Sequence, residues 1–243
     1  MMSSATVYGS GGRIGLIVPA NNSVIEPEFW SVLPPNVAVY ATRVMAKGDL
    51  TAAAVRKMEA EVDRAVAAIA ATGVDVIAYC DMVTTFIMEP DWNDLAVEEI
   101  SRQTGVAAFS AWTALRDALA QIGARRIALG TPYPRAIHEL APIFFTQRGF
   151  EVPTHATLDI TAMQEVPTVD RARLEAFVRS LDILGCDALV LLATDLPTFG
   201  CIENLESELR LPILSSNQAL LWRALKVVNQ KPSHPLGRLF IDV

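Results

Sequence analysis

The sequence predicts an α/β fold with two pseudo-symmetric lobes, each built on a parallel sheet, and three observations support this prediction. A block that ends at Asp81 recurs in the second half of the chain. Short apolar runs have the composition of buried strands, and amphipathic segments typical of helices separate them. We therefore expect strands and helices to alternate, with right-handed crossovers between neighbouring parallel strands.

The internal repeat is the strongest of these observations. Residues 73–81 (GVDVIAYCD) correspond to residues 185–193 (GCDALVLLA). Three further blocks recur in the same order, namely 13–19 with 126–132, 39–42 with 154–157, and 105–110 with 210–215. Two copies of such a long unit indicate two fused lobes rather than a stacked array of short repeats. Equivalent strand ends then face each other across a pseudo-twofold cleft, and chemistry is expected near Asp81 and Ala193.

The predicted strands are apolar runs without polar alternation, as in parallel sheets that are covered on both faces. They are residues 14–19, 37–41, 74–79, 106–110, 127–130, 189–192 and 212–215. The segment 51–71 is typical of an amphipathic helix, because apolar side chains such as Val55 and Val66 recur on one face and charged side chains cover the other.

The repeat also predicts how the chain is divided. We expect the first lobe to span residues 13–115 and the second lobe to span residues 116–215. The C-terminal segment 216–243 is expected to pack across onto the first lobe. Ligands of open parallel sheets bind beyond the carboxyl ends of the strands. The active site is therefore predicted in the cleft between the lobes.

Composition limits the class of protein. The chain has 243 residues, of which 51% are hydrophobic, and this is enough for a large core. A formal net charge of −7 argues against a nucleic-acid partner, which needs clustered Lys and Arg. No apolar run approaches the roughly 20 residues that span a bilayer, and the polar start of the chain lacks the order of a signal peptide. With three scattered cysteines, we expect a cytoplasmic protein without a membrane partner.

The histidines and the amphipathic helices lead to two further expectations. His138, His155 and His234 are isolated in the sequence and lack the spacing of metal ligands, so no metal is predicted. Amphipathic helices such as the segment 171–184 could form a subunit interface. We therefore expect a homo-oligomer.

Polar side chains follow the first and third predicted strands. Asn21 and Asn22 can cap the next helix, whose free N–H groups favour a carboxylate, but two adjacent amides exceed what one cap requires. Asp81 follows a deeply apolar run, where lost solvation raises the pKa of a carboxyl and suits it to acid or base chemistry near neutral pH. Its alternative role is a helix cap. Thr84 and Thr85 offer hydroxyl donors in the same loop.

The corresponding places in the second half of the chain also carry polar residues. Tyr133 lies between two prolines and can donate a hydrogen bond to an oxyanion. Thr194 and Asp195 either cap the next helix or point into the cleft. Ser216 and Asn217 begin the last long helix and add further donors. Capping alone explains some of these residues, but it does not explain all of them.

These residues lie in segments that resemble the aspartate/glutamate racemase superfamily, in the branch of maleate cis-trans isomerase and arylmalonate decarboxylase. The resemblance covers residues 14–240 and is carried by residues 15–22, 128–133 and 211–222. It implies two Rossmann-like lobes with the active site between them, a small-molecule carboxylate substrate, and neither a metal nor an organic cofactor. It also implies that Asn22 and Tyr133 hold the substrate carboxylate.

The resemblance places the two family cysteines at Asp81 and Ala193, and neither residue is a cysteine here. Cys80 lies one position earlier, and a shift of one residue turns a side chain to the opposite face of a strand. Cys201 lies eight positions after the second place. We therefore predict a cysteine-independent isomerase or lyase, decarboxylase-like, that acts on a small carboxylate or dicarboxylate. Asp81 would perform one-base proton chemistry, and Tyr133 would stabilise the oxyanion.

The rest of the pocket leaves the reaction open. Met82 and Val83 stand where the resemblance places small hydroxyl residues in decarboxylases, which argues against a decarboxylase-type pocket. The wall is expected to include Met82, Val83, Phe86, Met163 and Phe199. Two alternatives remain: a hydrolase or hydratase in which the carboxylate of the first lobe activates water, and a carboxylate-binding protein without catalysis.

Overall fold

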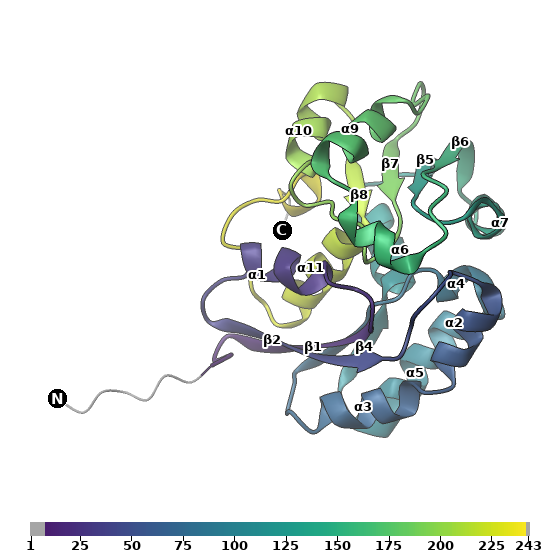
Figure 1. The fold of residues 1–243 in the computed structure, drawn as a ribbon. Helices are drawn as coiled ribbons and strands as arrows, with labels where there is room; N and C mark the ends of the chain where they lie inside the picture. The colour runs from purple at the N-terminus through teal and green to yellow at the C-terminus, as the bar shows by residue number, and fades with distance from the viewer. Residues whose placement is uncertain (1–7, 242–243) are drawn as a thin grey trace.

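The computed structural model describes residues 8–241 and shows two lobes, each with a four-stranded sheet flanked by helices (Figure 1). The first half contains β1 (Gly12–Pro19), α1 (Ile25–Val32), β2 (Val37–Val44), α2 (Ala52–Glu59), α3 (Val62–Ala70), β3 (Val76–Tyr79), α4 (Thr84–Ile87), α5 (Trp92–Thr104), β4 (Ala107–Ser110) and α6 (Ala111–Gln121). The second half contains β5 (Arg126–Thr131), α7 (Arg135–His138), α8 (Leu140–Gln147), β6 (Glu151–Thr157), the 3-10 helix η1 (Met163–Thr168), α9 (Arg171–Arg179), β7 (Ala188–Leu191), α10 (Ile202–Leu209), β8 (Ile213–Ser215), α11 (Ser216–Val227) and the 3-10 helix η2 (Arg238–Phe240).

The two sheets have the same topology, and every strand pair in them is parallel. The order is β2-β1-β3-β4 in the first sheet and β6-β5-β7-β8 in the second. Gly15 pairs with Ile77 in the first sheet, and Ala128 pairs with Leu189 in the second. These pairs occupy equivalent places in the sequence repeat. The predicted fold of two pseudo-symmetric α/β lobes is therefore confirmed.

The edge strand β6 is absent from the strands predicted by apolar composition. Exposed Glu151, Pro153 and His155 alternate along it with less exposed neighbours. A strand at the edge of a sheet tolerates proline, because the N–H that proline lacks would not be needed for the ladder. The central strands β3 and β7 are buried along their whole length, so their continuous apolar runs were detectable from the sequence.

The single helix predicted over residues 51–71 is wrong in one respect, because the chain breaks at Ala60 and Glu61 into α2 and α3. The two helices pack on different parts of the lobe. α2 contacts α4, whereas α3 contacts β1 and β2. Both keep the amphipathic pattern, with Val55 buried in α2 and Val66 buried in α3. The break therefore allows α2 to approach the cleft while α3 covers the sheet.

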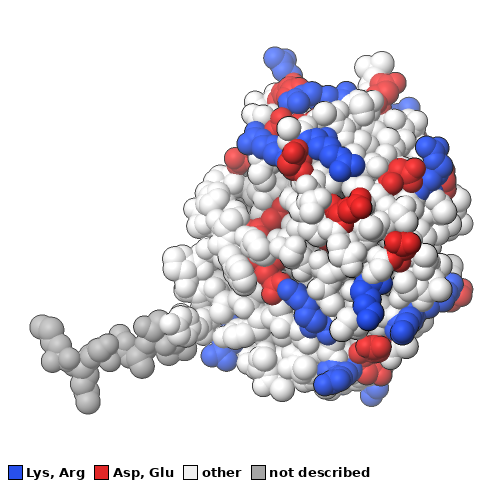
Figure 2. All heavy atoms as spheres, viewed as in Figure 1, with Lys and Arg blue, Asp and Glu red and all other residues white. Residues whose placement is uncertain are grey.

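The two lobes share their interior. α11 packs against α6 and also contacts β3 and α1, so helices from both ends of the chain lie between the two sheets (Figure 1). On the face shown in Figure 2, basic and acidic side chains are interspersed. Within residues 8–241, no helix combines the length and the apolar character that crossing a membrane requires. The domain boundaries, the cytoplasmic location and the homo-oligomer stay predictions.

Candidate active site

A cavity lies where the carboxyl ends of the central strands of both sheets meet. It comprises about 570 Å³ of space, including its opening to solvent. Its lining is Pro19, Asn21, Asn22, Ala46, Leu50, Ala54, Val55, Met58, Asp81, Met82, Val83, Tyr133, Ile160, Met163, Val166, Thr194 and Asp195. No Lys, Arg, His or Cys is found among the lining residues that the structure describes. The cavity therefore combines an apolar wall with amides, hydroxyls and two carboxyl groups.

Asp81 stands at the end of β3 and is 5% exposed. Its Oδ1 accepts hydrogen bonds from the Thr84 backbone N–H at 2.8 Å and from Thr84 Oγ1 at 3.0 Å. Burial raises the pKa of the Asp81 carboxyl, and these two hydrogen bonds partly offset the effect. The structure is therefore compatible with both predicted roles of Asp81, as a cap and as an acid or base. Its carboxyl binds Thr84 in the loop that follows, and it also lines the cavity.

Asp195 is the second carboxyl of the cavity and follows β7. Its Oδ2 accepts one hydrogen bond, from Asn21 Nδ2 at 3.3 Å. Burial raises the pKa of the Asp195 carboxyl to about 7, and the charge of Asp81 contributes in the same direction. Asn21 Oδ1 is buried and has no hydrogen-bond partner among the described residues. It is therefore free to accept a hydrogen bond from a ligand.

Asn22 and Thr194 join the two lobes at the inner end of the cavity. Asn22 Oδ1 caps α1 by accepting from the backbone N–H groups of Val24 at 2.9 Å and Ile25 at 3.1 Å. Asn22 Nδ2 donates to Thr194 Oγ1 at 3.1 Å, and Thr194 Oγ1 donates to the Cys80 carbonyl at 2.9 Å. The amide of Asn22 is thus occupied on both sides, although it lines the cavity.

Tyr133 lines the cavity from the loop after β5 and is 4% exposed. Phe86 packs edge-on against its ring, with 6.4 Å between the centroids. Burial raises the pKa of the Tyr133 hydroxyl well above its usual value, and the charges of Asp81 and Asp195 add to this effect. The hydroxyl therefore keeps its proton at neutral pH and can donate a hydrogen bond to an anionic ligand.

Four predicted substrate-binding residues do not line the cavity: Thr84, Thr85, Ser216 and Asn217. Each has a partner that holds it behind the wall. Thr84 binds Asp81, and Thr85 Oγ1 donates to Asn93 Oδ1 at 3.4 Å. Ser216 Oγ accepts from the Ala193 N–H at 3.2 Å, and Asn217 Nδ2 donates to the Thr194 carbonyl at 3.0 Å. In this structure these four residues contact residues of the wall or of the strand ends, and their contact with a substrate stays a prediction.

The predicted wall is correct at three of its five positions. Met82, Val83 and Met163 line the cavity. Phe86 instead supports Tyr133, and Phe199 stacks on Phe29 with 6.5 Å between the centroids.

Two loops, one from each lobe, supply wall residues that the sequence did not reveal. An antiparallel bridge between Asp49 and Ala162 joins these loops. The Leu50 N–H donates to the Thr161 carbonyl at 3.0 Å, and the Met163 N–H donates to the Gly48 carbonyl at 3.2 Å. No pattern in the sequence connects these distant loops, so wall residues such as Leu50 could not be predicted.

Glu28 is a further residue of the site whose role the sequence did not reveal. From α1 its carboxylate accepts hydrogen bonds from the Thr198 N–H, at 2.5 Å, and from the Phe199 N–H, at 2.8 Å. Its other oxygen accepts from Asn217 Nδ2 at 2.7 Å. Burial raises the pKa of the Glu28 carboxyl to about 7, against the lowering by these donors. A carboxylate of the first lobe thereby holds the loop that carries Asp195.

The thiols lie away from the cavity. Cys80 Sγ is buried and directed at the Ala78 carbonyl at 3.3 Å, and burial raises the pKa of this thiol well above its usual value. Cys201 Sγ approaches the Thr198 carbonyl at 3.1 Å, and burial raises its pKa to about 12. Ala193 does not line the cavity and has a backbone φ of 103°, in the region that favours glycine.

The prediction that the histidines are isolated is wrong for two of them. His138 Nε2 lies 2.9 Å from His155 Nδ1. The two residues are 17 positions apart in the sequence and meet because α7 packs against β6. Burial and the neighbouring His155 lower the pKa of His138. Spacing along the chain could not reveal this pair, since it depends on how the edge strand packs.

The fold and the site define a two-lobed α/β protein with its cavity between the lobes. Residues 14–240 match the family model described as arylmalonate decarboxylase. The chain is 30% identical to the maleate isomerase of Geobacillus stearothermophilus over 236 residues, which is 92% of this chain and 94% of that protein. It is 28% identical to the arylmalonate decarboxylase of Bordetella bronchiseptica over 173 residues, 69% of this chain and 72% of that one.

A solved structure agrees with these sequence relatives. It is a mutant of the Nocardia farcinica maleate cis-trans isomerase with a covalently bound succinylcysteine intermediate. That structure is 27% identical, with a TM-score of 0.89, and the match covers 96% of this chain and 99% of that one. The chain therefore belongs to the arylmalonate decarboxylase family. The branch predicted from the sequence is confirmed.

Proposed function

We propose that this protein is a cysteine-independent isomerase or lyase that performs one-base proton chemistry at Asp81 on a small carboxylate. One observation carries the proposal: a buried carboxyl with a raised pKa lines the cavity, while the thiols of Cys80 and Cys201 do not. Burial makes such a carboxylate a stronger base than one in solvent, which suits it to proton transfer. The related Nocardia enzyme, in contrast, has been captured with a succinylcysteine.

In this proposal the two carboxyls of the cavity have different roles, one as the base and the other as the acid. Two neighbouring acids share a proton, because desolvation and mutual repulsion oppose double ionisation. Asp81 is the better anion, since it accepts two hydrogen bonds from Thr84, whereas Asp195 accepts one longer bond from Asn21. Below a pH of about 7, Asp195 is therefore the protonated member of the pair. Asp81 is then the base, and Asp195 is a neutral acid that donates a hydrogen bond to the substrate.

The proton transfer can be written for a carbon next to a carboxylate. Asp81 takes the proton from this carbon, and the electron pair of the C–H bond moves onto the carboxylate as an enediolate. Tyr133 and protonated Asp195 donate hydrogen bonds to the negative oxygens, which stabilises the enediolate. Asp81 then returns the proton either to the same carbon, which only exchanges hydrogen with solvent, or to the γ-carbon of a β,γ-unsaturated acid, which shifts the double bond and completes an isomerisation. In a lyase reaction, a malonate-type diacid loses carbon dioxide and leaves the same enediolate; protonated Asp195 transfers its proton to the carbon and is then reprotonated from solvent.

The cavity predicts how a carboxylate is held. Since none of the described lining residues is cationic, the substrate anion depends on neutral donors, namely the Tyr133 hydroxyl and the carboxyl proton of Asp195. The apolar wall, which includes Met58 and Met163, favours a substrate with a hydrocarbon part.

The test is to incubate the protein in D₂O with maleate and with substituted malonates, and to follow each compound by proton NMR. Deuterium uptake or loss of carbon dioxide supports the proposal, whereas isomerisation of maleate without deuterium uptake would contradict proton transfer as the reaction. Hydration, or ring opening of cyclic imides or hydantoins, would instead assign water activation to Asp81. Prior alkylation of thiols should leave turnover unchanged. Inactivation by alkylation that substrate prevents would contradict the cysteine-independent mechanism.

A further inference from the structure

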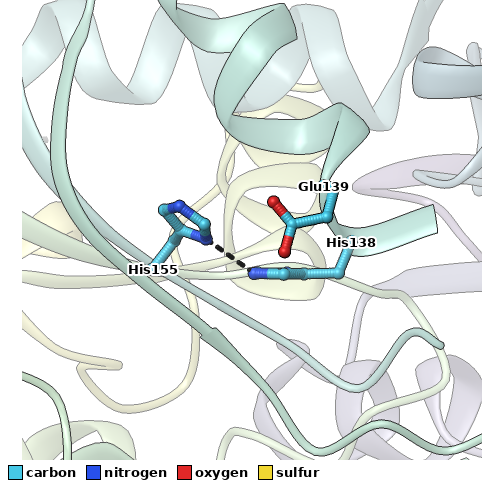
Figure 3. A group of neighbouring side chains, drawn as sticks. All are labelled: His138, Glu139 and His155. Atoms are coloured by element: carbon cyan, nitrogen blue, oxygen red, sulfur yellow. Dashed lines mark hydrogen bonds between the residues drawn. The ribbon is translucent and has the colours of Figure 1, made fainter. Parts of the chain in front are cut away.

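Outside the cavity, three side chains of the second lobe form a cluster of metal-ligating groups (Figure 3). They are His138 at the end of α7, Glu139 next to it, and His155 on β6. One nitrogen of each imidazole and one carboxylate oxygen all lie within 4.8 Å of one another. Figure 3 shows the carboxylate of Glu139 beside the two facing rings. None of the three lines the cavity.

A buried hydrogen bond orients the inner ring of the cluster. Thr131 Oγ1 lies 2.9 Å from His138 Nδ1, and His138 is 2% exposed. When the hydroxyl oxygen accepts from Nδ1–H, the lone pair of Nε2 points at His155. Metal-bound histidines use their second nitrogen in this way, and the partner sets both tautomer and ring orientation.

The spacing of the cluster suits an ion. Ligand bonds of about 2.0–2.2 Å place two tetrahedral ligands about 3.4 Å apart. His138 Nε2 and His155 Nδ1 are 2.9 Å apart and need to separate by only a few tenths of an ångström. Glu139 and His155 are exposed, so their side chains can adjust and water can complete the coordination.

We propose that His138, Glu139 and His155 bind a divalent transition-metal ion, and that Zn²⁺ fits the donor set best. Two imidazoles and one carboxylate suit zinc and its first-row neighbours, whereas Ca²⁺ and Mg²⁺ prefer oxygen ligands alone. The ion would be a structural one. It would fasten β6 to α7, which follows the loop that presents Tyr133; the carbonyl of Tyr133 already accepts a hydrogen bond from Thr157 of β6. This proposal does not depend on the reaction at Asp81.

The experiment uses the full chain without an affinity tag, stripped with a chelator and then titrated with Zn²⁺ by calorimetry. One ion per chain should bind. His155→Ala should weaken binding at least tenfold, and Glu139→Gln should weaken it by a smaller factor. His234→Ala is the matched control, because His234 is an exposed histidine far along the chain from this cluster, and it should bind Zn²⁺ as the wild type does.

Two further readouts decide the proposal without reference to activity. Co²⁺ should give the visible absorption of a nitrogen and oxygen site, and His155→Ala should abolish it. Zn²⁺ should also raise the melting temperature of the wild type, and it should leave that of His155→Ala unchanged. Equal Zn²⁺ affinity in the wild type and His155→Ala would overturn the proposal, as would the absence of saturable binding. Because both variants change exposed side chains, neither should prevent folding.

Discussion

The ends of β3 and β7 occupy equivalent places in the two lobes, yet their acids are held in different ways. Asp81 directly follows β3, and its own loop supplies the donors, from Thr84. Asp195 stands two positions beyond the equivalent place, and its donor, Asn21, comes from the other lobe. The donors to Asp81 therefore come from its own loop, and their two hydrogen bonds stabilise its ionised form. The second acid, Asp195, depends on the contact between lobes, and burial raises its pKa to about 7, so it keeps its proton below that pH.

The largest effect is expected when the charge of Asp81, the acid after β3, is removed. Asp81→Asn should lower kcat by about 10²–10⁴-fold, the usual contribution of a general base. The amide still accepts from Thr84, so the loop should keep its conformation. The measurement is deuterium incorporation into the turned-over carboxylate in D₂O, with binding followed by calorimetry. Asp63→Asn, at an exposed position of α3, is the control. Full activity of Asp81→Asn would refute the assignment of the base.

The second acid should act through its proton. For wild type, binding of a carboxylate should weaken as pH rises through about 7, because Asp195 then ionises and repels the substrate. Asp195→Asn keeps a hydrogen-bond donor but cannot ionise. We expect this variant to retain activity within about tenfold below pH 7 and to lose the decline in affinity above pH 7. Affinity measured between pH 5.5 and 8.5 tests this. An unchanged decline in the variant would mean that another group titrates.

Glu28 tests how far the second strand end depends on the first lobe. Burial raises the pKa of the Glu28 carboxyl from its ordinary value of 4.5 to about 7 in the folded protein, so the protonated form is favoured on folding. This contribution is fully present below pH 4.5 and is lost as pH rises through 7, and it amounts to roughly 3 kcal/mol. Relative to wild type, Glu28→Gln should therefore become more stable as pH rises from 4.5 to 8.

Urea unfolding of both proteins across this range measures the difference. The variant-to-wild-type difference in free energy of unfolding should change by roughly 2–3 kcal/mol, allowing for partial exposure of Glu28. Glu61→Gln, an exposed change, should show a constant difference. A constant difference for Glu28→Gln as well would show that the carboxylate is ionised throughout and that the donors from Thr198 and Phe199 dominate over burial.

Local signals in the sequence predicted the first strand end better than the second. The apolar run before Asp81 and the four repeated blocks define buried strands, so the parallel sheets and the cleft were predictable. The contacts of Asn217 with Glu28 and of Asn21 with Asp195 span more than 170 positions and depend on lobe packing. No periodicity encodes such contacts. For the same reason, the sequence could not show that Thr84, Thr85, Ser216 and Asn217 lie behind the lining of the cavity.

The smallest expected effect concerns the backbone at Ala193, where the second strand end departs from ordinary geometry with a φ of 103°. An alanine held there is strained by about 1–3 kcal/mol, and glycine is not. Ala193→Gly should therefore raise the free energy of unfolding or leave it unchanged, within about 1 kcal/mol, because added chain entropy opposes the relief of strain. Ala188→Gly, in the buried interior of β7, has no strain to relieve and should destabilise by about 1 kcal/mol or more. If both substitutions destabilise the protein equally, the backbone at Ala193 stores no strain. The ends of β3 and β7 would then differ in the hydrogen bonding of Asp81 and Asp195 and not in backbone strain.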